Sequence, residues 1–322
     1  MTGAEEDAGL TVSVVVPTLD RPARAAAVVR ALLSGDEVPL EILVVDQSED
    51  DRTARALHGQ PDERVRRLSH RPPSTSGARN AGARAARGDY VAFLDDDVEF
   101  AASWLASVRA ELRALGLPDA IFGEVHEPEG FVADRTHLPV SLFHIEEARV
   151  WEKPVHPNRV GYAANFVCRR AVFLELGGFD PRLGPGTRFY GAEDIDLAYR
   201  LLKGGYRVAS SPRFQIVHQQ WREPEVLPRL FYGYNVGGAA FCAKHLRAGD
   251  ARAALFLLVQ VRDDAKMFAS AVKRRSPLRA RVAAARTFGT WSGLARGLRS
   301  LGSGASPKGP GTSPGSRPAD GS

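Results

Sequence analysis

Three adjacent carboxylates, Asp95, Asp96 and Asp97, come directly after a short apolar run of the chain. Adjacent carboxylates repel one another and raise each other's pKa unless a cation neutralises them. Oxygen ligands favour Mg²⁺ or Mn²⁺ over zinc, and Mg²⁺ completes its coordination with waters and substrate phosphates. The triplet therefore indicates either a divalent metal site that binds a nucleotide diphosphate or a solvated acidic turn.

Glu193 and Asp194 form a second acidic group, which follows the Gly- and Pro-containing loop 183–188. They open a predicted helix, 193–202, and the helix dipole alone favours acidic side chains in a first helical turn. A carboxylate in that place can instead serve as a general base, which takes the proton from an attacking hydroxyl. The residue pattern leaves both interpretations open.

Strands and helices must alternate to position these groups. Continuous apolar runs predict strands at 12–16, 42–45, 65–68 and 90–94, and helical spacing predicts helices at 24–33 and 76–87. Such alternation indicates βαβ units and a mostly parallel sheet, in which ligands bind beyond the carboxyl ends of the strands. Thr18, Asp46 and Asp95 follow three of these strands, so we expect them to face one crevice.

The rest of the chain divides by composition. Two further short strands are predicted at 207–210 and 214–217, and no internal repeat is evident. The last segment is rich in Gly, Ser and Pro and almost devoid of apolar residues, which is typical of disorder. We expect a flexible N-terminus at 1–9, an α/β domain at 10–225, a helical basic segment at 226–300 and a disordered tail at 301–322.

Composition excludes several classes of protein. The chain has 322 residues, 44% hydrophobic and 25% charged, which rules out a wholly disordered, collagen-like or coiled-coil protein. Cys168 and Cys242 are too few for a disulfide framework and indicate reduced thiols. Residues 1–9 do not resemble a secretory signal, and the apolar stretch 253–259 is far shorter than the ~20 residues that span a bilayer. We expect a cytoplasmic protein with no membrane-spanning helix.

The basic charge is concentrated near the C-terminus. Residues 251–300 carry eleven Lys and Arg against two Asp, whereas residues 1–250 have a net charge of −5. Apolar residues recur there near helical spacing, with arginines between them: Leu278, Val282, Phe288, Trp291, Leu294 and Leu298. This pattern suits an interfacial helix at the inner face of a membrane, and equally a helix that packs on the α/β domain. Nucleic-acid binding is disfavoured, because no helix-turn-helix pattern or aromatic basic platform accompanies the charge.

Several motifs in order resemble the inverting family 2 glycosyltransferases of the GT-A fold. They are VVPT at 15–18 with Arg21, VVD at 44–46, GARNAG at 77–82, GDY at 88–90, FLDDD at 93–97, GGFD at 177–180 and GAED at 191–194. Together they span roughly residues 11–220, and the ordered set is far more specific than any one motif. The resemblance implies a Rossmann-like, mixed and mostly parallel sheet flanked by helices, here with a C-terminal helical extension.

The resemblance also implies roles for single residues. The donor nucleotide would be bound by Pro17, Thr18, Asp46, Arg79, Asp95 and Asp96, with Asp46 on the base and Asp96 on the ribose. Asp97 would hold Mn²⁺ or Mg²⁺ at the diphosphate, and His218 would be a further ligand, although a lone histidine is most often structural. Asp194 would be the general base, and Glu193 would bind the acceptor or orient its loop.

We therefore expect a metal-dependent inverting glycosyltransferase. It would move a sugar from a nucleotide-diphosphate sugar to a hydroxyl of a glycan, a lipid-linked acceptor or a small molecule. One alternative is a sugar nucleotidyltransferase, but residues 17–20 lack the Gly-rich, Arg- or Lys-bearing loop of such enzymes. The other is a catalytically silent nucleotide-sugar-binding scaffold at a membrane, which would not need Asp194.

Overall fold

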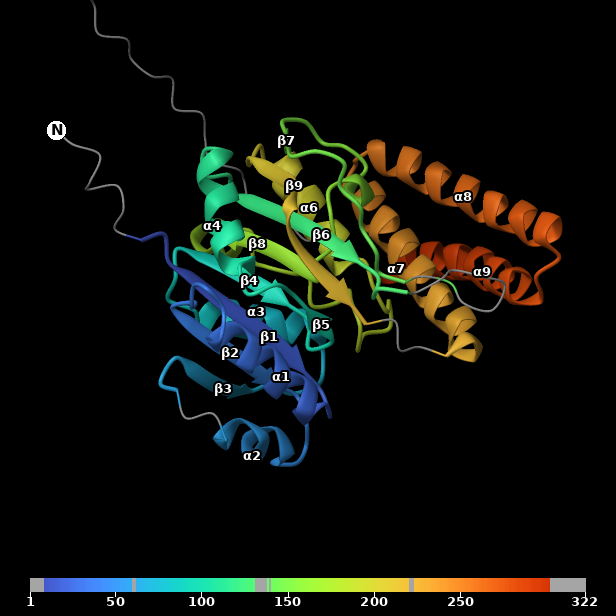
Figure 1. Ribbon diagram of the computed structural model, residues 1–322. Helices are drawn as coiled ribbons and strands as arrows, with labels where there is room; N and C mark the ends of the chain where they lie inside the picture. The colour runs from blue at the N-terminus through green and yellow to red at the C-terminus, as the bar shows by residue number, and fades with distance from the viewer. Residues whose placement is uncertain (1–8, 60–61, 131–137, 139, 220–222, 302–322) are drawn as a thin grey trace, which may run out of the picture.

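The structure is a computed structural model that describes residues 9–59, 62–130, 138, 140–219 and 223–301. A central sheet carries helices on both faces, and three long helices are gathered at one end of the molecule (Figure 1). The predicted flexible N-terminus, apart from Gly9, and the predicted disordered tail, apart from Leu301, lie outside the described residues.

The described strands form a mixed sheet. Its order is β3 (Val65–Ser69), β2 (Glu41–Asp46), β1 (Val12–Thr18), β4 (Tyr90–Leu94), β8 (Asn165–Arg169), β6 (Ala120–His126), β9 (Val208–His218) and β5 (Val98–Glu99), with β7 (Arg149–Trp151) paired to β9. β1 is parallel to β2 and β4, β2 is parallel to β3, and β6 is parallel to β9. β8 is antiparallel to β4 and β6. The predicted fold class, mixed and mostly parallel with a helical C-terminal extension, is confirmed.

Helices bury both faces of the sheet, which explains why its first strands are continuous apolar runs. On one face, the side chains of Val14 and Val16 pack against α1 (Pro22–Leu33) and α4 (Trp104–Ala114). On the other, Val15 and Leu43 pack with α3 (Thr75–Ala85), α5 (Arg170–Glu175) and α6 (Glu193–Lys203). The short helix α2 (Arg52–His58) lies beside α1.

One prediction about the strands is wrong in detail. The two short strands expected at 207–210 and 214–217 are the single strand β9. Its pairing with β6 shifts register between Gly123 and Glu124, so the intervening residues bulge without ending the strand. The polar SSPR sequence at 210–213, which lies at this shift, explains why the apolar pattern suggested two elements.

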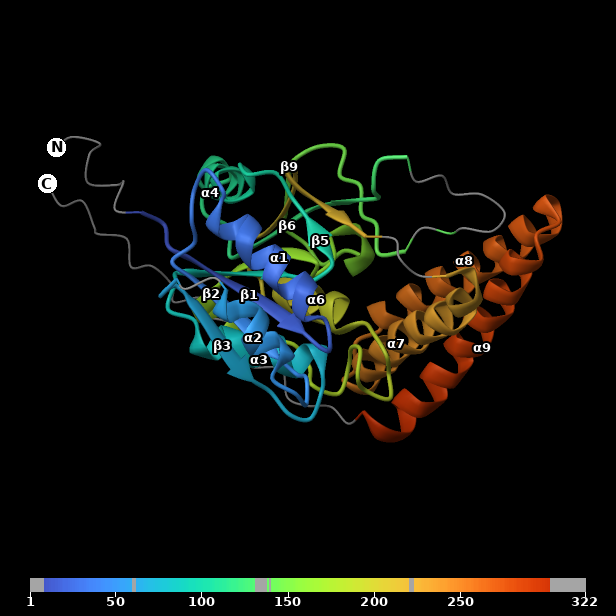
Figure 2. The same ribbon diagram turned by 60° about the horizontal axis from the view of Figure 1, so that its bottom comes forward.

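The C-terminal extension consists of α7 (Leu227–Arg247), α8 (Arg252–Arg274) and α9 (Pro277–Ser300), which pack side by side (Figure 2). Glycines let α9 approach the backbone of α7 closely. A Cβ added at Gly293 would lie 2.2 Å from Val236 O, and one at Gly289 would lie 2.5 Å from Tyr232 O. These distances are too short for any side chain, so α9 packs on α7 through its glycines.

The predicted apolar stripe of the last helix is therefore divided. Val282 is buried in a small cluster with Leu138, Val140 and Leu227. The aromatic part of the stripe stays in solvent, since Phe288 is 69% exposed and Trp291 is 56% exposed. Across the residues that the structure describes, we find no helix with an apolar stretch long enough to cross a bilayer.

A buried ion cluster joins α7 to α6. Asp196 is fully buried and accepts hydrogen bonds from Arg200 at 2.8 Å and Lys244 at 2.7 Å, with His245 at 3.0 Å. Burial alone would raise the pKa of Asp196, but Lys244 and Arg200 hold it well below its ordinary value. Lys244 also contacts Asp180 at 2.8 Å. This cluster ties the helices on either side of residue 225 together. The predicted domain boundary at that residue stays a prediction.

Candidate active site

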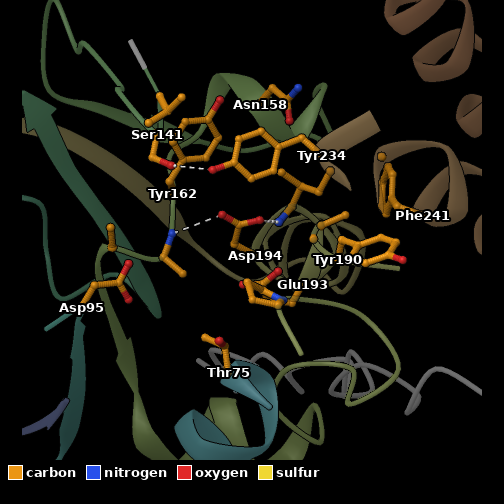
Figure 3. A pocket seen from close by; sticks show the side chains of 18 of the residues that line it. Thr75, Asp95, Ser141, Asn158, Tyr162, Tyr190, Glu193, Asp194, Tyr234 and Phe241 are labelled. Carbon is orange, nitrogen blue, oxygen red and sulfur yellow. Dashed lines mark hydrogen bonds between the residues drawn. The ribbon is translucent and has the colours of Figure 1, made fainter. Parts of the chain in front are cut away.

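A cavity of about 1120 Å³ lies at the carboxyl ends of β1, β4 and β9 and reaches α6 and α7 (Figure 3). Its lining includes nearly all of the residues proposed from the sequence: Pro17, Thr18, Arg79, Asp95, Asp96, Asp97, Glu193, Asp194 and His218. Asp46 is the exception. The expectation that ligands bind beyond the carboxyl ends of the strands therefore identified residues that lie in one cavity although they are up to 201 positions apart in the chain.

Asp95, Asp97 and His218 form a group that could hold a divalent ion. Each offers one ligand atom, and the three atoms lie within 4.8 Å of one another. Asp97 Oδ1 lies 3.6 Å from His218 Nε2. Antiparallel pairing of Val98 with His218 brings the end of β9 beside the triplet. Two carboxylates and one imidazole are a donor set that fits Mn²⁺ or Mg²⁺.

Asp96 points away from this group toward β1. Its carboxylate accepts hydrogen bonds from Thr18 Oγ1 at 2.7 Å and from Arg21 Nη1 at 2.9 Å. Burial raises the pKa of Asp96 above its ordinary value, and the neighbouring Asp97 adds to the increase, although Thr18 and Arg21 oppose it. These hydrogen bonds attach Asp96 to the end of β1 and the loop that follows it. The contact of Asp96 with ribose stays a prediction.

Asp46 lies behind the cavity rather than in its wall. The side chain is fully buried, and its two oxygens accept hydrogen bonds from Ser48 N at 2.9 Å and Arg67 Nη1 at 2.8 Å. The next residue, Gln47, does line the cavity. Recognition of the donor base by Asp46 therefore stays a prediction, and it would require the carboxylate to add a third partner.

Arg79 connects the metal-ligand group to the acidic pair. Its guanidinium donates to Asp95 Oδ1 at 2.6 Å and to Glu193 Oε1 at 3.1 Å, and the side chain is buried. It also lies over the ring of Phe179, 5.4 Å from the centroid. The predicted place of Arg79 near the nucleotide is not tested by these contacts, but its position between the two acidic groups is a feature that the sequence did not reveal.

Glu193 and Asp194 begin α6 after a loop with unusual backbone. Tyr190 and Ala192 have φ values of 62° and 73°, a left-handed conformation that costs roughly 1–2 kcal/mol for a residue with a Cβ. The loop rests on α7, since a Cβ at Gly237 would lie 2.6 Å from the carbonyl carbon of Gly191. We infer that this support maintains the strained turn, which directs both carboxylates into the cavity (Figure 3).

Both acidic side chains have raised pKa values. Burial and the neighbouring Asp194 raise the pKa of Glu193 to about 7, against the opposing effect of Arg79. Burial also raises the pKa of Asp194, while the Ile195 N–H and Arg79 lower it. Asp194 accepts hydrogen bonds from Ile195 N at 2.8 Å and Ala163 N at 3.4 Å. A carboxylate with a raised pKa is a stronger general base than an ordinary one.

Tyr162, Tyr190 and Tyr234 lie around Asp194 in the cavity (Figure 3). Tyr162 lies beside Asp194, and burial followed by the charge of Asp194 raises its pKa to about 12. Tyr234 OH and Ser141 Oγ share a hydrogen bond of 3.2 Å. Four residues that line the cavity were not predicted from the sequence: Ser141, Tyr190, Tyr234 and Phe241. The only sequence pattern that could have indicated them was the aromatic FYGY at 231–234, which is not followed by any motif of catalytic or metal-binding residues.

Comparisons with known proteins agree on a family. Residues 13–177, just over half of the chain, match the family described as Glycosyl transferase family 2. A pre-mycofactocin glycosyltransferase of Mycobacterium tuberculosis is 33% identical over 175 residues, which cover 51% of this chain and 35% of that protein. A glucosyl-dolichyl phosphate glucuronosyltransferase of Haloferax volcanii is 25% identical over 219 residues, covering 65% of this chain and 69% of that protein. The chain thus matches only about a third of the length of the mycobacterial relative.

A solved structure with a similar fold is the mannosyltransferase PcManGT of Pyrobaculum calidifontis, in complex with GDP-Man and Mn²⁺. The two share a TM-score of 0.57 at 18% sequence identity, over 88% of this chain and 86% of that one. At this identity the likeness concerns the fold. The family match ends at residue 177, before the acidic pair, so that pair has to be judged on its own geometry.

Proposed function

Because the chain belongs to glycosyltransferase family 2 and has the GT-A fold, we propose that it is a metal-dependent inverting glycosyltransferase. It would move a sugar from a nucleotide-diphosphate sugar to a hydroxyl group. The observation that carries this proposal is that one cavity contains both the Asp95–Asp97–His218 group and the Glu193–Asp194 pair, with Arg79 between them.

The metal-ligand group defines the donor end of the cavity in this proposal. Asp95, Asp97 and His218 would hold Mn²⁺ or Mg²⁺, which when bound neutralises the diphosphate charge that develops as the sugar leaves. The mannosyltransferase with a similar fold binds GDP-Man together with Mn²⁺, which supports this assignment. Arg21 and Arg24 lie 3.3 and 3.6 Å from Asp97 and add positive charge at the same end.

Asp194 would act as the general base at the other end. The acceptor hydroxyl gives its proton to the carboxylate of Asp194 while its oxygen forms a bond to the anomeric carbon. The bond from that carbon to the diphosphate oxygen breaks on the opposite face, and the nucleotide diphosphate leaves with the electron pair. One base suffices, the configuration inverts, and no covalent intermediate forms. Glu193, which is paired with Arg79, would orient the loop or bind the acceptor.

The tyrosines around Asp194 would form the acceptor end. Their rings offer flat apolar faces on which a sugar ring can stack, and their hydroxyls offer hydrogen bonds. The Haloferax relative is named for a lipid-linked sugar, glucosyl-dolichyl phosphate, which supports a lipid-linked acceptor among those that this cavity would take.

Donor binding tests the proposed function directly. Calorimetric titration with UDP, GDP and dTDP should find one nucleotide that binds at least about tenfold more tightly with Mn²⁺ than with a chelator, because an ion held by Asp95, Asp97 and His218 would offset the charge of the diphosphate. The corresponding nucleotide-sugar should then release nucleotide faster when acceptor glycans or glycolipids are added. Donor affinity that is the same with and without metal would contradict the proposal.

We also propose that the C-terminal helices attach the enzyme to an anionic membrane surface. Large apolar side chains are exposed on α8 and α9: Leu255, Leu258, Phe268, Val272, Phe288 and Trp291. Residues 251–300, which contain both helices, carry a net charge of +9. Exposed aromatic residues together with cations are the features of interfacial helices. Cys168 and Cys242 are buried free thiols, in line with attachment on the cytoplasmic side.

Vesicle flotation tests this attachment. Phe288→Ser combined with Trp291→Ser should reduce binding to anionic vesicles about tenfold or more, because each aromatic side chain contributes on the order of 1.5–3 kcal/mol when buried. Leu40→Ser, at an exposed apolar residue just before β2, is the matched control and should bind like the wild type. Equal binding by all three proteins would leave these residues without a membrane role.

A further inference from the structure

A second group of metal-ligating side chains lies at the carboxyl end of β6. Glu124, His126 and His144 each offer a donor atom, and the three atoms lie within 4.8 Å of one another. Glu124 Oε2 is 3.2 Å from His126 Nε2, and Glu124 Oε1 is 3.5 Å from His144 Nδ1. Ligand atoms of a tetrahedral zinc ion, with bonds of about 2.0–2.1 Å, are separated by similar distances.

This group is separate from the Asp95–Asp97–His218 group. The register of β6 and β9 places Glu124 beside Gln215 and His126 beside Val217. Because side chains alternate between the two faces of a sheet, these residues lie on the face opposite to His218. Among the described residues that line the cavity, none belongs to this second group. A metal bound there would take no part in the transfer reaction itself.

Two details of the histidines point to a metal. His126 Nε2 is a buried atom with no hydrogen-bond partner in the described part of the chain, although Glu124 lies close to it. Buried polar atoms are nearly always satisfied, and a metal ion would satisfy this one. His144 presents its other ring nitrogen, Nε2, to Glu127 Oε2 at 3.6 Å. A carboxylate behind a histidine ligand fixes the ring tautomer at many zinc sites.

We propose that Glu124, His126 and His144 bind a zinc ion, with a fourth position open to water. Two imidazoles and one carboxylate form a donor set that suits zinc. The group at the cavity has two carboxylates and one imidazole, and its larger share of oxygen favours Mn²⁺ or Mg²⁺. One chain would therefore hold two different metals, each selected by its own ligands.

The zinc would fasten the chain around His144 to the end of β6. Val125 and Phe143 exchange backbone hydrogen bonds of 2.9 and 3.0 Å at the same place. Ser141, three residues before His144, lines the cavity and contacts Tyr234. The ion would thus hold one wall of the acceptor end in position. This consequence rests on the proposed function, whereas the zinc site does not.

Metal content and cobalt spectroscopy test the proposal. The full chain, prepared without a histidine tag, is stripped with a chelator and then equilibrated with micromolar Zn²⁺ or Co²⁺ alone. Wild type and Asp97→Asn should each retain about one zinc ion per chain, and Co²⁺ should give the visible absorption of a tetrahedral site. The double variant His126→Gln, His144→Gln should retain about a tenth of that zinc or less and lack the cobalt absorption.

The double variant should fold, because the side chains of His126 and His144 are 32% and 58% exposed. An unchanged melting temperature of the metal-free proteins verifies this. Zinc should raise the Tm of the wild type and not that of the double variant. His58→Gln, at an exposed histidine on α2, is the matched control and should keep its zinc.

Two results would overturn the zinc site: equal zinc content in wild type and double variant, or binding by the wild type only at millimolar concentration. Failure of the proposed function is distinguishable from both. If the chain retains zinc in this test and transfers no sugar from any donor, the zinc site is supported and the proposed glycosyltransferase activity is refuted.

Discussion

Asp194→Asn should lower kcat about 10³-fold and leave the affinity for the donor nucleotide unchanged, because an amide cannot take the proton of the acceptor hydroxyl. The change is nearly isosteric, and Asp194 accepts hydrogen bonds from the backbone N–H groups of Ala163 and Ile195 rather than from a side chain of the metal-ligand group. Initial rates of nucleotide release at saturating donor and acceptor give kcat. Calorimetry with Mn²⁺ gives the donor Kd of both proteins.

Two matched variants separate catalysis from general damage. Asp51→Asn makes the same chemical change at an exposed residue before α2 and should leave kcat unchanged. Glu193→Gln removes the charge that pairs with Arg79 and should raise the acceptor KM more than it lowers kcat. An Asp194→Asn enzyme that kept more than about a tenth of the wild-type rate would show that another group is the base.

Asp97→Asn should remove the manganese dependence of donor binding and lower kcat/KM about 10²–10³-fold. One oxygen of Asp97 lies 3.6 Å from His218 Nε2, and its other oxygen faces Arg21 and Arg24. An ion that stabilises a leaving diphosphate contributes several kcal/mol to the transition state, and each 1.36 kcal/mol is tenfold in rate. Nucleotide titrations with and without Mn²⁺ measure the binding effect.

His218→Gln provides the graded comparison. It removes one ligand of the three and leaves both carboxylates, so the loss of manganese-dependent affinity should be smaller than for Asp97→Asn. If Mn²⁺ enhanced donor binding by Asp97→Asn as much as by the wild type, the ion would have to bind elsewhere. The Asp95–Asp97–His218 group would then be an acidic cluster balanced by Arg21 and Arg24.

Local patterns in the sequence were sufficient for the strands β1 to β4 and for the acidic groups at the edge of the sheet. The apolar run at 90–94 and the helical spacing at 76–87 place Asp95 and Arg79 without any knowledge of distant contacts. The same holds for Glu193 and Asp194, which begin a helix with a clear stop at Gly204. In a βαβ fold such strand ends and helix starts converge by topology alone.

The features that the sequence did not reveal depend on contacts between distant segments. One of them is the contact between Asp97 and His218, a ligand that only the family resemblance suggested: Val98 and Glu99 pair with the end of β9, and two residues are too few to give a strand signal. Tyr234 and Phe241 enter the cavity from α7, whose position is set by Lys244 on the buried Asp196. The spacing in α9 predicted a helix and left its packing face open, because the closest approaches to α7 are at glycines, which carry no hydropathy signal.

The close approach of Gly237 to Gly191 has a consequence for protein engineering. An expression fragment that stopped at the end of β9 would keep every metal ligand and both acidic residues, yet the turn before Glu193 would lose the helix it rests on. Chimeras that exchange acceptor loops between relatives should therefore transplant α7 together with the segment 183–192. Grafting the loop alone would carry over the sequence of the acceptor site without its scaffold.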